Sequence, residues 1–337
     1  MIRLGIVGTN TISDWCVGAV RAADAGRESA AHLQPAAVFS RDAHRGAEFA
    51  ARHGIGRAVD SLESLFPLVD AVYVASPTAV HADQALAAIA AGKHVLVEKT
   101  MAHSASAVEQ IFAAADAAGV VAMEATRHLY HPAFAVWAEA VRSVGAVRYA
   151  HLEMLQYSSR YDAVRAGEYR SAFDPATGNS ALVDIGVYCL EAALDVWGEP
   201  RAHSGASVHL ANGFEAGGAL HLDYADAVVE VAYSKIVQGV SPSVVVAEDG
   251  VVSIDSLAEP SRITRTRRGG EEEVLYSGLK PAPVDTMPYE LLAFAAQVRG
   301  EASDGGRRAV TRGARRIMDQ HLARVTPEPV TPEVPTP

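Results

Sequence analysis

The chain has 337 residues, and its 29 Lys and Arg against 40 Asp and Glu leave a formal net charge of −11. Hydrophobic residues make up 49% and charged residues 20%, which is typical of a globular protein with a sizeable core, and the length predicts two domains. A diffuse negative charge disfavours binding to nucleic acid or to anionic membranes, because both attract clustered Lys and Arg. No apolar stretch reaches the roughly 18 residues that a membrane span needs.

Cysteine and histidine patterns indicate neither a disulfide framework nor a metal site. Cys16 and Cys189 lie far apart without a CxxC motif, and the 13 histidines are scattered without HxH or HExxH spacing. The first residues run directly into a strand pattern rather than a signal peptide. We therefore expect a cytoplasmic protein without a bound metal.

The first 125 residues alternate short apolar runs with alanine-rich helical stretches. The expected strands are residues 2–7, 36–40, 71–75, 94–97 and 120–124. Short apolar strands that each precede a helix are typical of βαβ units and of a doubly wound parallel sheet. Gly92 is expected to end the helix before it, and Gly119 the next helix, which a capping-box pattern at Ser106 and Glu109 begins.

Residues 126–325 are predicted to form a second, α+β domain with a large, mostly antiparallel sheet. The expected strands are 147–157, 219–224, 228–233, and a hairpin in which Asp249-Gly250 joins 244–248 to 251–254. The expected helices are 184–197, 288–298 and 307–324. Residues 326–337 contain five prolines and are predicted to be a disordered tail.

The turn after the first strand has the layout of a dinucleotide-binding site. Such a site places a glycine at the strand end, a small residue where the backbone approaches the pyrophosphate, and another small residue where the helix meets the strand. Gly8, Asn10 and Ser13 occupy these places, and Asn tolerates the left-handed conformation better than most residues. A plain strand-to-helix turn is the alternative. The candidate cofactor residues of this turn are Gly8, Thr9, Asn10, Thr11 and Ile12.

The end of the second strand favours NADP over NAD. NAD sites place an acid there for the ribose hydroxyls, whereas NADP sites place cations for the 2′-phosphate. Here Ser40 and Arg41 end the strand and Arg45 follows one turn later, and charge-assisted hydrogen bonds to phosphate contribute about 1.5–3 kcal/mol each. NAD stays the second choice because Asp42 can reach a ribose. Alternatively, both arginines are only surface residues of the second helix.

Five motifs together resemble the glucose–fructose oxidoreductase and inositol dehydrogenase family (Gfo/Idh/MocA). They lie at residues 8–10, 75–81, 91–99, 124–132 and 181–188, and the sequence AGKHVLVEK at 91–99 is the most specific. The resemblance implies a Rossmann domain at 1–125, followed by a domain whose open sheet commonly packs against a second subunit. It therefore implies a homodimer or homotetramer formed through the C-terminal sheet.

The resemblance also implies the catalytic residues. In such enzymes a lysine of an EKP motif lies at the nicotinamide, and here it falls on Lys99, with Thr100 where proline is usual. The second catalytic segment is an Asp followed four residues later by His or Tyr. This chain has Asp184 and Tyr188 and is similar to the tyrosine branch, whose members act on dihydrodiols, anhydrofructose and some aldoses.

Asp184 and Tyr188 are spaced to lie on one face of a helix. Removing a hydride from a secondary alcohol requires a group that takes the hydroxyl proton, and the reverse reaction requires a group that returns it. Either Tyr188 or Lys99 can fill this role, since a lysine cation favours a nearby phenolate. Asp184 is expected to bind a substrate hydroxyl or to orient Lys99. A core aromatic with its hydroxyl at the rim is the alternative for Tyr188.

Further residues are expected to line the cleft. Tyr161, in the polar segment 157–162, is a candidate for substrate binding. A cap of its own helix is the alternative for His81, and a pair with Glu124 is the alternative for Arg127. The remaining candidate neighbours of the cofactor are Ser76, Pro77, His81, Glu98, Lys99 and Arg127.

The sequence thus predicts an NAD(P)-dependent oxidoreductase. It is expected to transfer a hydride between the nicotinamide and a secondary alcohol or carbonyl of a sugar, cyclitol or dihydrodiol. Two alternatives use the same scaffold. One is a non-catalytic protein that senses a sugar or nucleotide, and the other is a redox-neutral glycosidase that retains its nicotinamide.

Overall fold

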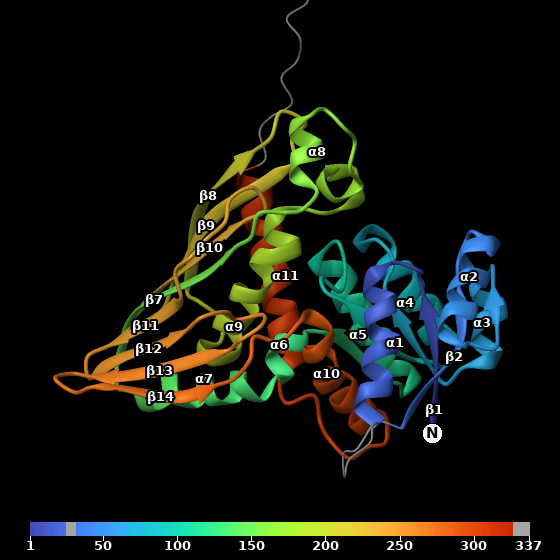
Figure 1. Cartoon of the computed structure of the whole chain (residues 1–337), viewed down its shortest axis with the longest axis horizontal. Helices are drawn as coiled ribbons and strands as arrows, with labels where there is room; N and C mark the ends of the chain where they lie inside the picture. The colour runs from blue at the N-terminus through green and yellow to red at the C-terminus, as the bar shows by residue number, and fades with distance from the viewer. Residues whose placement is uncertain (25–31, 326–337) are drawn as a thin grey trace, which may run out of the picture.

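The computed structural model describes residues 1–24 and 32–325, so the predicted tail at 326–337 lies outside the described residues. Two β-sheets stand side by side, with helices between them and around the first (Figure 1). This arrangement confirms the predicted fold class, a doubly wound parallel sheet followed by an α+β unit with a large, mostly antiparallel sheet.

The first sheet is parallel throughout and has the order β3-β2-β1-β4-β5-β6. Its strands are β1 (Ile2–Val7), β2 (Leu33–Phe39), β3 (Ala58–Val59), β4 (Ala71–Val74), β5 (His94–Glu98) and β6 (Ala122–Ala125). The five predicted strands are confirmed. The sixth, β3, has only two residues and no apolar run that could have predicted it.

The helices of this part are α1 (Thr11–Asp24), α2 (Ala43–His53), α3 (Leu62–Leu65), α4 (His81–Ala90) and α5 (Ala105–Ala118). Gly92 and Gly119 have positive φ angles of 71° and 66° after α4 and α5, as predicted. The predicted capping box at Ser106 and Glu109 is wrong. Ser104 caps α5 instead, since its hydroxyl accepts from the amide of Ala107 at 3.2 Å.

The second sheet has eight strands in the order β14-β13-β12-β11-β7-β10-β9-β8, antiparallel except for the pair β7–β10. The strands are β7 (Val147–Leu155), β8 (Ala202–His209), β9 (Glu215–Asp223), β10 (Val228–Ser234), β11 (Ser243–Ala247), β12 (Gly250–Ile254), β13 (Arg262–Arg267) and β14 (Glu272–Ser277). The predicted hairpin exists, but Ala247 pairs with Gly250. Glu248 and Asp249 therefore form the turn, one residue earlier than predicted.

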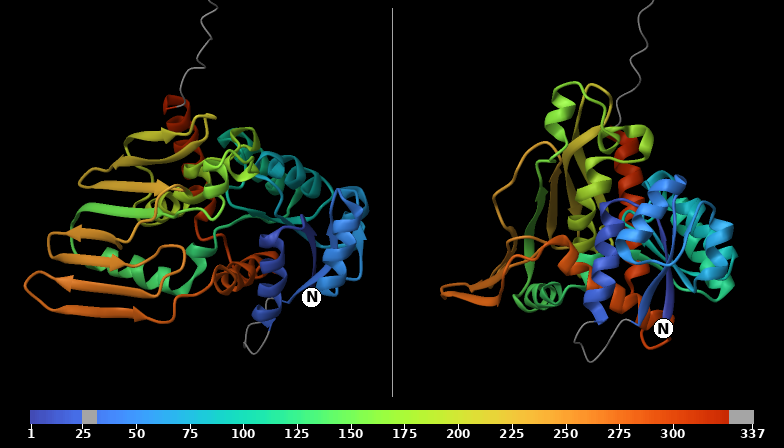
Figure 2. Two further views of the ribbon diagram at one scale, coloured as in Figure 1. Left: turned by 45° about the horizontal axis from the view of Figure 1, so that its top comes forward. Right: turned by 45° about the vertical axis from the view of Figure 1, so that its right-hand side comes forward.

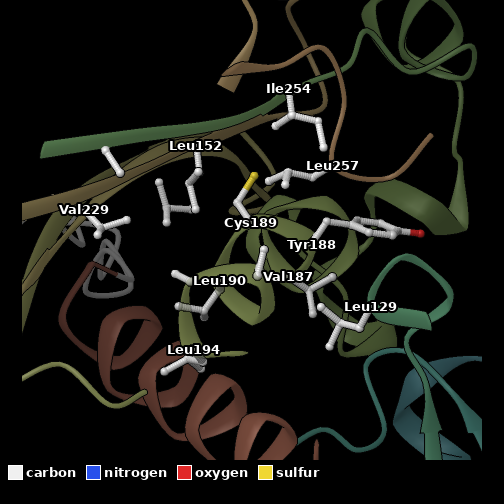
Figure 3. Close-up of a cluster of buried hydrophobic side chains, with 14 of the residues drawn as sticks. Leu129, Leu152, Val187, Tyr188, Cys189, Leu190, Leu194, Val229, Ile254 and Leu257 are labelled. Atoms are coloured by element: carbon white, nitrogen blue, oxygen red, sulfur yellow. The ribbon is translucent and has the colours of Figure 1, made fainter. Parts of the chain in front are cut away.

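Helices cover only one face of this sheet (Figure 2). The helices of this part are α6 (Arg127–Tyr130), α7 (Pro132–Ser143), α8 (Tyr161–Arg165), α9 (Val187–Trp197), α10 (Pro283–Val298) and α11 (Arg307–Val325). Apolar side chains of α7, α9 and α11 form a core with the inward-facing residues of the strands. Tyr188 lies at the edge of this core, with its hydroxyl directed away from the other apolar side chains (Figure 3).

The two parts of the molecule meet along two helix pairs, α1 with α10 and α5 with α11. Helix α10 packs along α1, and its residues Met287, Leu291 and Phe294 are buried with the core of the first sheet. The carboxyl ends of β1, β4 and β5 thus face the start of α9. Within residues 1–24 and 32–325, no helix is long and apolar enough to cross a membrane, and no three His, Cys, Asp or Glu are grouped to hold a metal ion.

Candidate active site

A cleft of about 540 Å³ lies where the carboxyl ends of the parallel strands face the second sheet. It extends from the first turn of α1 to the segment that precedes α9. Of the residues predicted from the sequence, the cleft is lined by Asn10, Thr11, Ile12, Ser76, Pro77, His81, Glu98, Lys99 and Asp184. Residues that were not predicted also line it: Trp15, Ala75, Thr78, Arg160, Ser171, Ala172, Thr177 and Asn179.

Gly8 and Asn10 shape the turn between β1 and α1. Gly8 has a φ of +111°, and a Cβ there would lie 2.9 Å from the carbonyl oxygen of Ala75. Asn10 does not use its tolerance of the left-handed conformation, since its φ is not positive. Its amide nitrogen instead donates to the Ala75 carbonyl at 2.7 Å, while its Oδ1 accepts from the amide of Ser13 at 3.1 Å. Asn10 therefore caps α1 and joins the ends of β1 and β4.

The start of α1 fits an anionic dinucleotide. A helix begins with four amides that have no partner in a preceding turn. Asn10 takes one of them through its Oδ1, which accepts from Ser13, while its carbonyl oxygen accepts the first regular helix bond, from Asp14. The amides of Thr11 and Ile12 remain at the cleft, where the positive end of the helix favours a pyrophosphate.

The tip of β2 is arranged for a phosphate rather than for ribose hydroxyls. The Oδ1 of Asp42 accepts from the amides of His44 and Arg45 at 3.0 and 3.1 Å and thereby caps α2. Its carboxylate is therefore turned into the helix. Arg41 and Arg45 are exposed, and neither side chain forms an ion pair with any residue that the structure describes. Ser40 is buried, and its hydroxyl oxygen accepts from the amide of Asp42 at 3.3 Å.

His81 fixes the wall of the cleft. Its Nε2 lies 2.7 Å from the carbonyl oxygen of Ser76, and its Nδ1 lies 3.1 Å from that of Thr100. The ring is buried, and burial lowers its pKa, so a neutral imidazole donates to one of the two carbonyls. The alternative role of capping its own helix is thus wrong. His81 connects the loop after β4 to the segment that carries Lys99.

Lys99 and Asp184 meet at the inner end of the cleft because the helix is locally widened. Leu182–Gly186 forms a π-helical turn before α9, and such turns leave backbone carbonyls without their usual partners. The carbonyl oxygen of Asp184 accepts from Lys99 Nζ, and that of Val183 accepts from the Thr100 hydroxyl at 2.8 Å. Lys99 Nζ also donates to Asp184 Oδ1 at 2.9 Å.

Lys235 is a second lysine on Asp184 that sequence reasoning missed. It follows β10, is almost fully buried, and places its Nζ 2.8 Å from Asp184 Oδ2 and 2.9 Å from the carbonyl oxygen of Ala172. The Nζ also lies 4.9 Å from the ring centre of Phe173, a favourable contact for a cation. Both carboxylate oxygens of Asp184 are therefore held by ammonium groups.

These contacts determine the charge states of Asp184 and Lys99. Burial alone would raise the pKa of Asp184 and lower that of Lys99. The attraction of Lys99 and Lys235 outweighs burial and holds the pKa of Asp184 below its ordinary value. The attraction of Asp184 likewise raises the pKa of Lys99 above its ordinary value. Both groups are thus ionised at neutral pH, and Asp184 orients Lys99.

Tyr188 lies beside this pair, and Arg127 lies beside Tyr188. Lys99 Nζ is 5.2 Å from the ring centre of Tyr188, so the structure brings the three predicted catalytic residues together. Arg127 Nη2 donates to the Tyr188 hydroxyl at 3.3 Å and also bonds Glu259. Arg127 is not among the residues that line the cleft. Its ion pair is with Glu259 rather than with Glu124, so that alternative is wrong.

Two further predicted residues have distinct surroundings. Glu98 lines the cleft, accepts from the buried Tyr73 hydroxyl and receives the Lys99 amide at 3.2 Å. Tyr161 does not line the cleft, because its ring stacks on Phe173 with 5.6 Å between ring centres. The neighbouring Arg160 lines the cleft in its place.

Comparison with known proteins gives a consistent result. The model of the "Oxidoreductase family, NAD-binding Rossmann fold" (GFO_IDH_MocA) matches residues 2–126. Over 305 residues, the chain is 37% identical to scyllo-inositol 2-dehydrogenase (NADP(+)) IolU of Bacillus subtilis (strain 168). The alignment covers 89% of this chain and 89% of that one. Over 168 residues it is 36% identical to trans-1,2-dihydrobenzene-1,2-diol dehydrogenase of Sus scrofa, or 49% of this chain and 48% of that one.

Solved structures share the fold. KijD10, a 3-ketoreductase from Actinomadura kijaniata solved in complex with NADP and TDP-benzene, superposes with a TM-score of 0.80. The two sequences are 23% identical, and the superposition covers 96% of this chain and 97% of that chain.

Proposed function

The chain belongs to the Gfo/Idh/MocA family of NAD(P)-dependent oxidoreductases, and from this premise we propose that it interconverts a secondary alcohol and a ketone on a polyhydroxylated ring, with NADP as the preferred cofactor. The observation that carries the proposal is that Lys99 and Asp184 line the inner end of a cleft whose outer end fits a dinucleotide, with the ring of Tyr188 directly beside Lys99. A polyol such as a cyclitol or sugar is the proposed substrate class.

The proposed chemistry divides between the cofactor and the protein. A bound nicotinamide supplies or accepts the hydride. Lys99 has three N–H groups, of which two are held by Asp184, so one remains for the reacting oxygen of the substrate. Because Lys99 stays protonated, it stabilises negative charge on that oxygen. Tyr188 is then the group that gives its proton to the oxygen during reduction and takes it back during oxidation.

The lining of the inner cleft supports a substrate with several hydroxyl groups. Ser171, Thr177 and Asn179 lie there together with Asp184, and such side chains donate to and accept from hydroxyls. The similarity to scyllo-inositol 2-dehydrogenase (NADP(+)) IolU supports a cyclitol as the first substrate to test. The similarity to a dihydrodiol dehydrogenase places dihydrodiols in the same screen.

The preference for NADP rests on the tip of β2. Asp42 caps α2 and is turned away from a ribose, whereas Arg41 and Arg45 carry exposed guanidinium groups beside Ser40. A 2′-phosphate at this place gains charge-assisted hydrogen bonds that an NAD ribose cannot form.

We also propose a homodimer or homotetramer formed through the uncovered face of the eight-stranded sheet. Tyr149, Val208 and Val228 lie on that face and are each at least 40% exposed. Light scattering coupled to size exclusion measures the assembly, and a monomer at micromolar concentration contradicts the proposal. Cys16 and Cys189 are both unpaired and buried, as is usual in the reducing cytoplasm that we propose as the location.

A substrate screen tests the proposed function. The purified chain is assayed with inositols, sugars and dihydrodiols, with NADP and NAD separately, and nicotinamide absorbance is followed. We expect turnover of at least one cyclitol or sugar and faster turnover with NADP. Absence of turnover with all three classes and both cofactors would overturn the proposal.

Substitution of Lys99 tests the site. Lys99→Ala is expected to abolish turnover and to leave the affinity for NADPH nearly unchanged, because the amides and arginines that hold the phosphates lie elsewhere. Lys93→Ala, just before the same strand, is the control and is expected to behave as the wild type. Full activity of Lys99→Ala removes Lys99 from the mechanism.

A further inference from the structure

The guanidinium of Arg127 is almost fully committed to contacts within the protein. Nη1 donates to Thr286 Oγ1 at 2.6 Å and to the carbonyl oxygen of Ala258 at 3.1 Å. Nη2 donates to Glu259 and, at 3.3 Å, to the hydroxyl oxygen of Tyr188. Arg127 itself is only 9% exposed. A guanidinium has five N–H donors, and the four on its terminal nitrogens are thus used.

This arrangement fixes the position of the cation. Its four acceptors belong to three separate parts of the chain, namely the segment after β12, the start of α10 and the first turn of α9. Attraction to Glu259 and Tyr188 outweighs burial and raises the pKa of Arg127 above its ordinary value. The guanidinium is therefore a permanent and immobile donor rather than a ligand that swings into the cleft.

An immobile donor determines where the hydrogen of Tyr188 lies. A phenol has a single O–H, and an arginine cannot accept a hydrogen bond. The Tyr188 oxygen must therefore accept from Arg127, so its own hydrogen points elsewhere. The ring is confined in this position, because the centre of the His128 ring lies 4.9 Å from its centre in an edge-to-face contact and Lys99 Nζ lies 5.2 Å from its centre.

We infer that Arg127 is a positioning residue that directs the hydroxyl hydrogen of Tyr188 toward the reacting oxygen of the substrate. The inference rests on the proposed function and deepens it, since it explains why Tyr188 rather than Lys99 transfers the proton. Lys99 is held by its ion pair with Asp184. The hydroxyl hydrogen of Tyr188, in contrast, is not used in the contact with Arg127.

The proton and electron balance of the step is simple. During reduction, the hydride from the reduced nicotinamide adds to the carbonyl carbon, and the two electrons of the carbonyl π bond move to the oxygen. The O–H bond of Tyr188 breaks, and its proton joins that oxygen to complete the alcohol. The phenolate that remains lies between the cations of Lys99 and Arg127 and regains a proton from water. Oxidation follows the reverse course.

The first part of the test is a double-mutant cycle of Arg127→Met and Tyr188→Phe. Turnover is measured with NADP and the best substrate of the screen, beginning with scyllo-inositol. Arg127→Met is expected to lower kcat by about 100-fold, as when a reacting group loses its orientation, with the affinity for NADPH within about twofold. Arg142→Met, on the exposed face of α7, is the control and is expected to keep wild-type kcat.

The cycle distinguishes orientation from a merely structural role. If Arg127 acts through the Tyr188 hydroxyl, Arg127→Met has no further effect once Tyr188 is Phe. An equal loss in both backgrounds overturns the inference, because it shows that Arg127 acts independently of the hydroxyl. Arg127→Lys keeps a cation and is expected to recover part of kcat. If Arg127→Met does not fold, the same cycle is run with Arg127→Lys and decides on the same criterion.

A solvent isotope effect gives the second readout. Poor orientation of the hydroxyl makes proton transfer slower, so the ratio of kcat in H₂O to kcat in D₂O is expected to rise in Arg127→Met. An unchanged ratio with wild-type kcat in Arg127→Met overturns the inference about Arg127, even where Tyr188→Phe has a strongly reduced but measurable kcat. Wild-type turnover of Tyr188→Phe instead contradicts the proposed proton donor itself, so the two failures are distinct.

Discussion

Replacement of Lys235 by methionine tests the two-lysine arrangement around Asp184. The substitution removes one ammonium that bonds Asp184 Oδ2 at 2.8 Å and the Ala172 carbonyl at 2.9 Å. Methionine fills a similar volume but donates no hydrogen bond. Asp184 Oδ1 still accepts from Lys99 Nζ at 2.9 Å, whereas Asp184 Oδ2 and the Ala172 carbonyl lose their donor.

The size of the effect follows from burial. Removing one partner of a buried ion pair costs about 3–5 kcal/mol. The lower end, about 3 kcal/mol, applies here because Lys99 still neutralises Asp184. At about 2 °C per kcal/mol for a chain of this size, the melting temperature is expected to fall by about 6 °C. Since a carboxylate held from one side only fixes Lys99 less precisely, kcat is expected to fall by about 10- to 100-fold.

The dependence of stability on pH gives a further check. The lysines hold the pKa of Asp184 below its ordinary value in the folded state, so the carboxylate adds stability above its unfolded pKa of about 3.9. This stability is lost as pH falls through the lower, folded value. In Lys235→Met the folded pKa moves upward, and the loss is therefore expected to begin at a higher pH on acidification.

The assays are thermal unfolding across acidic and neutral pH, turnover, and NADPH titration. NADPH affinity is expected to stay unchanged, because Lys235 lies behind Asp184 and outside the cleft lining. Lys280→Met, at an exposed position, is the matched control. A Lys235→Met protein with the stability, acid response and kcat of the wild type would refute the reasoning. It would show that the ion pair with Lys99 alone is sufficient to hold Asp184.

Two further predictions concern the cofactor. Arg41→Ala and Arg45→Ala are each expected to weaken NADPH binding about tenfold, equivalent to about 1.4 kcal/mol, and to leave NADH binding unchanged. Fluorescence titration measures the affinity for both cofactors. Equal losses of affinity for NADPH and NADH contradict a 2′-phosphate site. Gly8→Ala is expected to weaken both cofactors and to lower the melting temperature, because its Cβ would lie 2.9 Å from the Ala75 carbonyl oxygen at a φ of +111°; wild-type binding and stability would contradict this.

The sequence predicted those features that depend on local patterns. Short apolar strands followed by helices revealed the parallel sheet, and Gly119 with its positive φ ended α5 where expected. The sequence also predicted the turn from β1 into α1, although Asn10 shapes this turn for another physical reason. Asn10 serves through its side chain, which caps α1 and bonds Ala75, and no backbone preference is involved.

Contacts between residues that are far apart in the sequence could not be predicted from local sequence patterns. Lys235 is 51 positions from Asp184 in the sequence, in the segment after an ordinary apolar strand, and only the pairing of β10 beside the π-helical turn brings them together. The partner of Arg127 was sought at the nearby Glu124 but is Glu259, 132 positions away. A lone lysine directly after a buried strand was the one available signal for Lys235, since a buried lysine requires a fixed anionic partner.

The charge around the site also explains how an acidic chain can carry out this reaction. Three cations, the buried Lys235 and Arg127 and the partly buried Lys99, pair with two carboxylates, Asp184 and Glu259. These five groups together carry a net positive charge within a protein whose formal net charge is −11. Because they are wholly or partly buried, they act on a nearby reacting oxygen more strongly than the distant surface acids do. An oxygen that gains negative charge during reduction is thus stabilised by groups already in place.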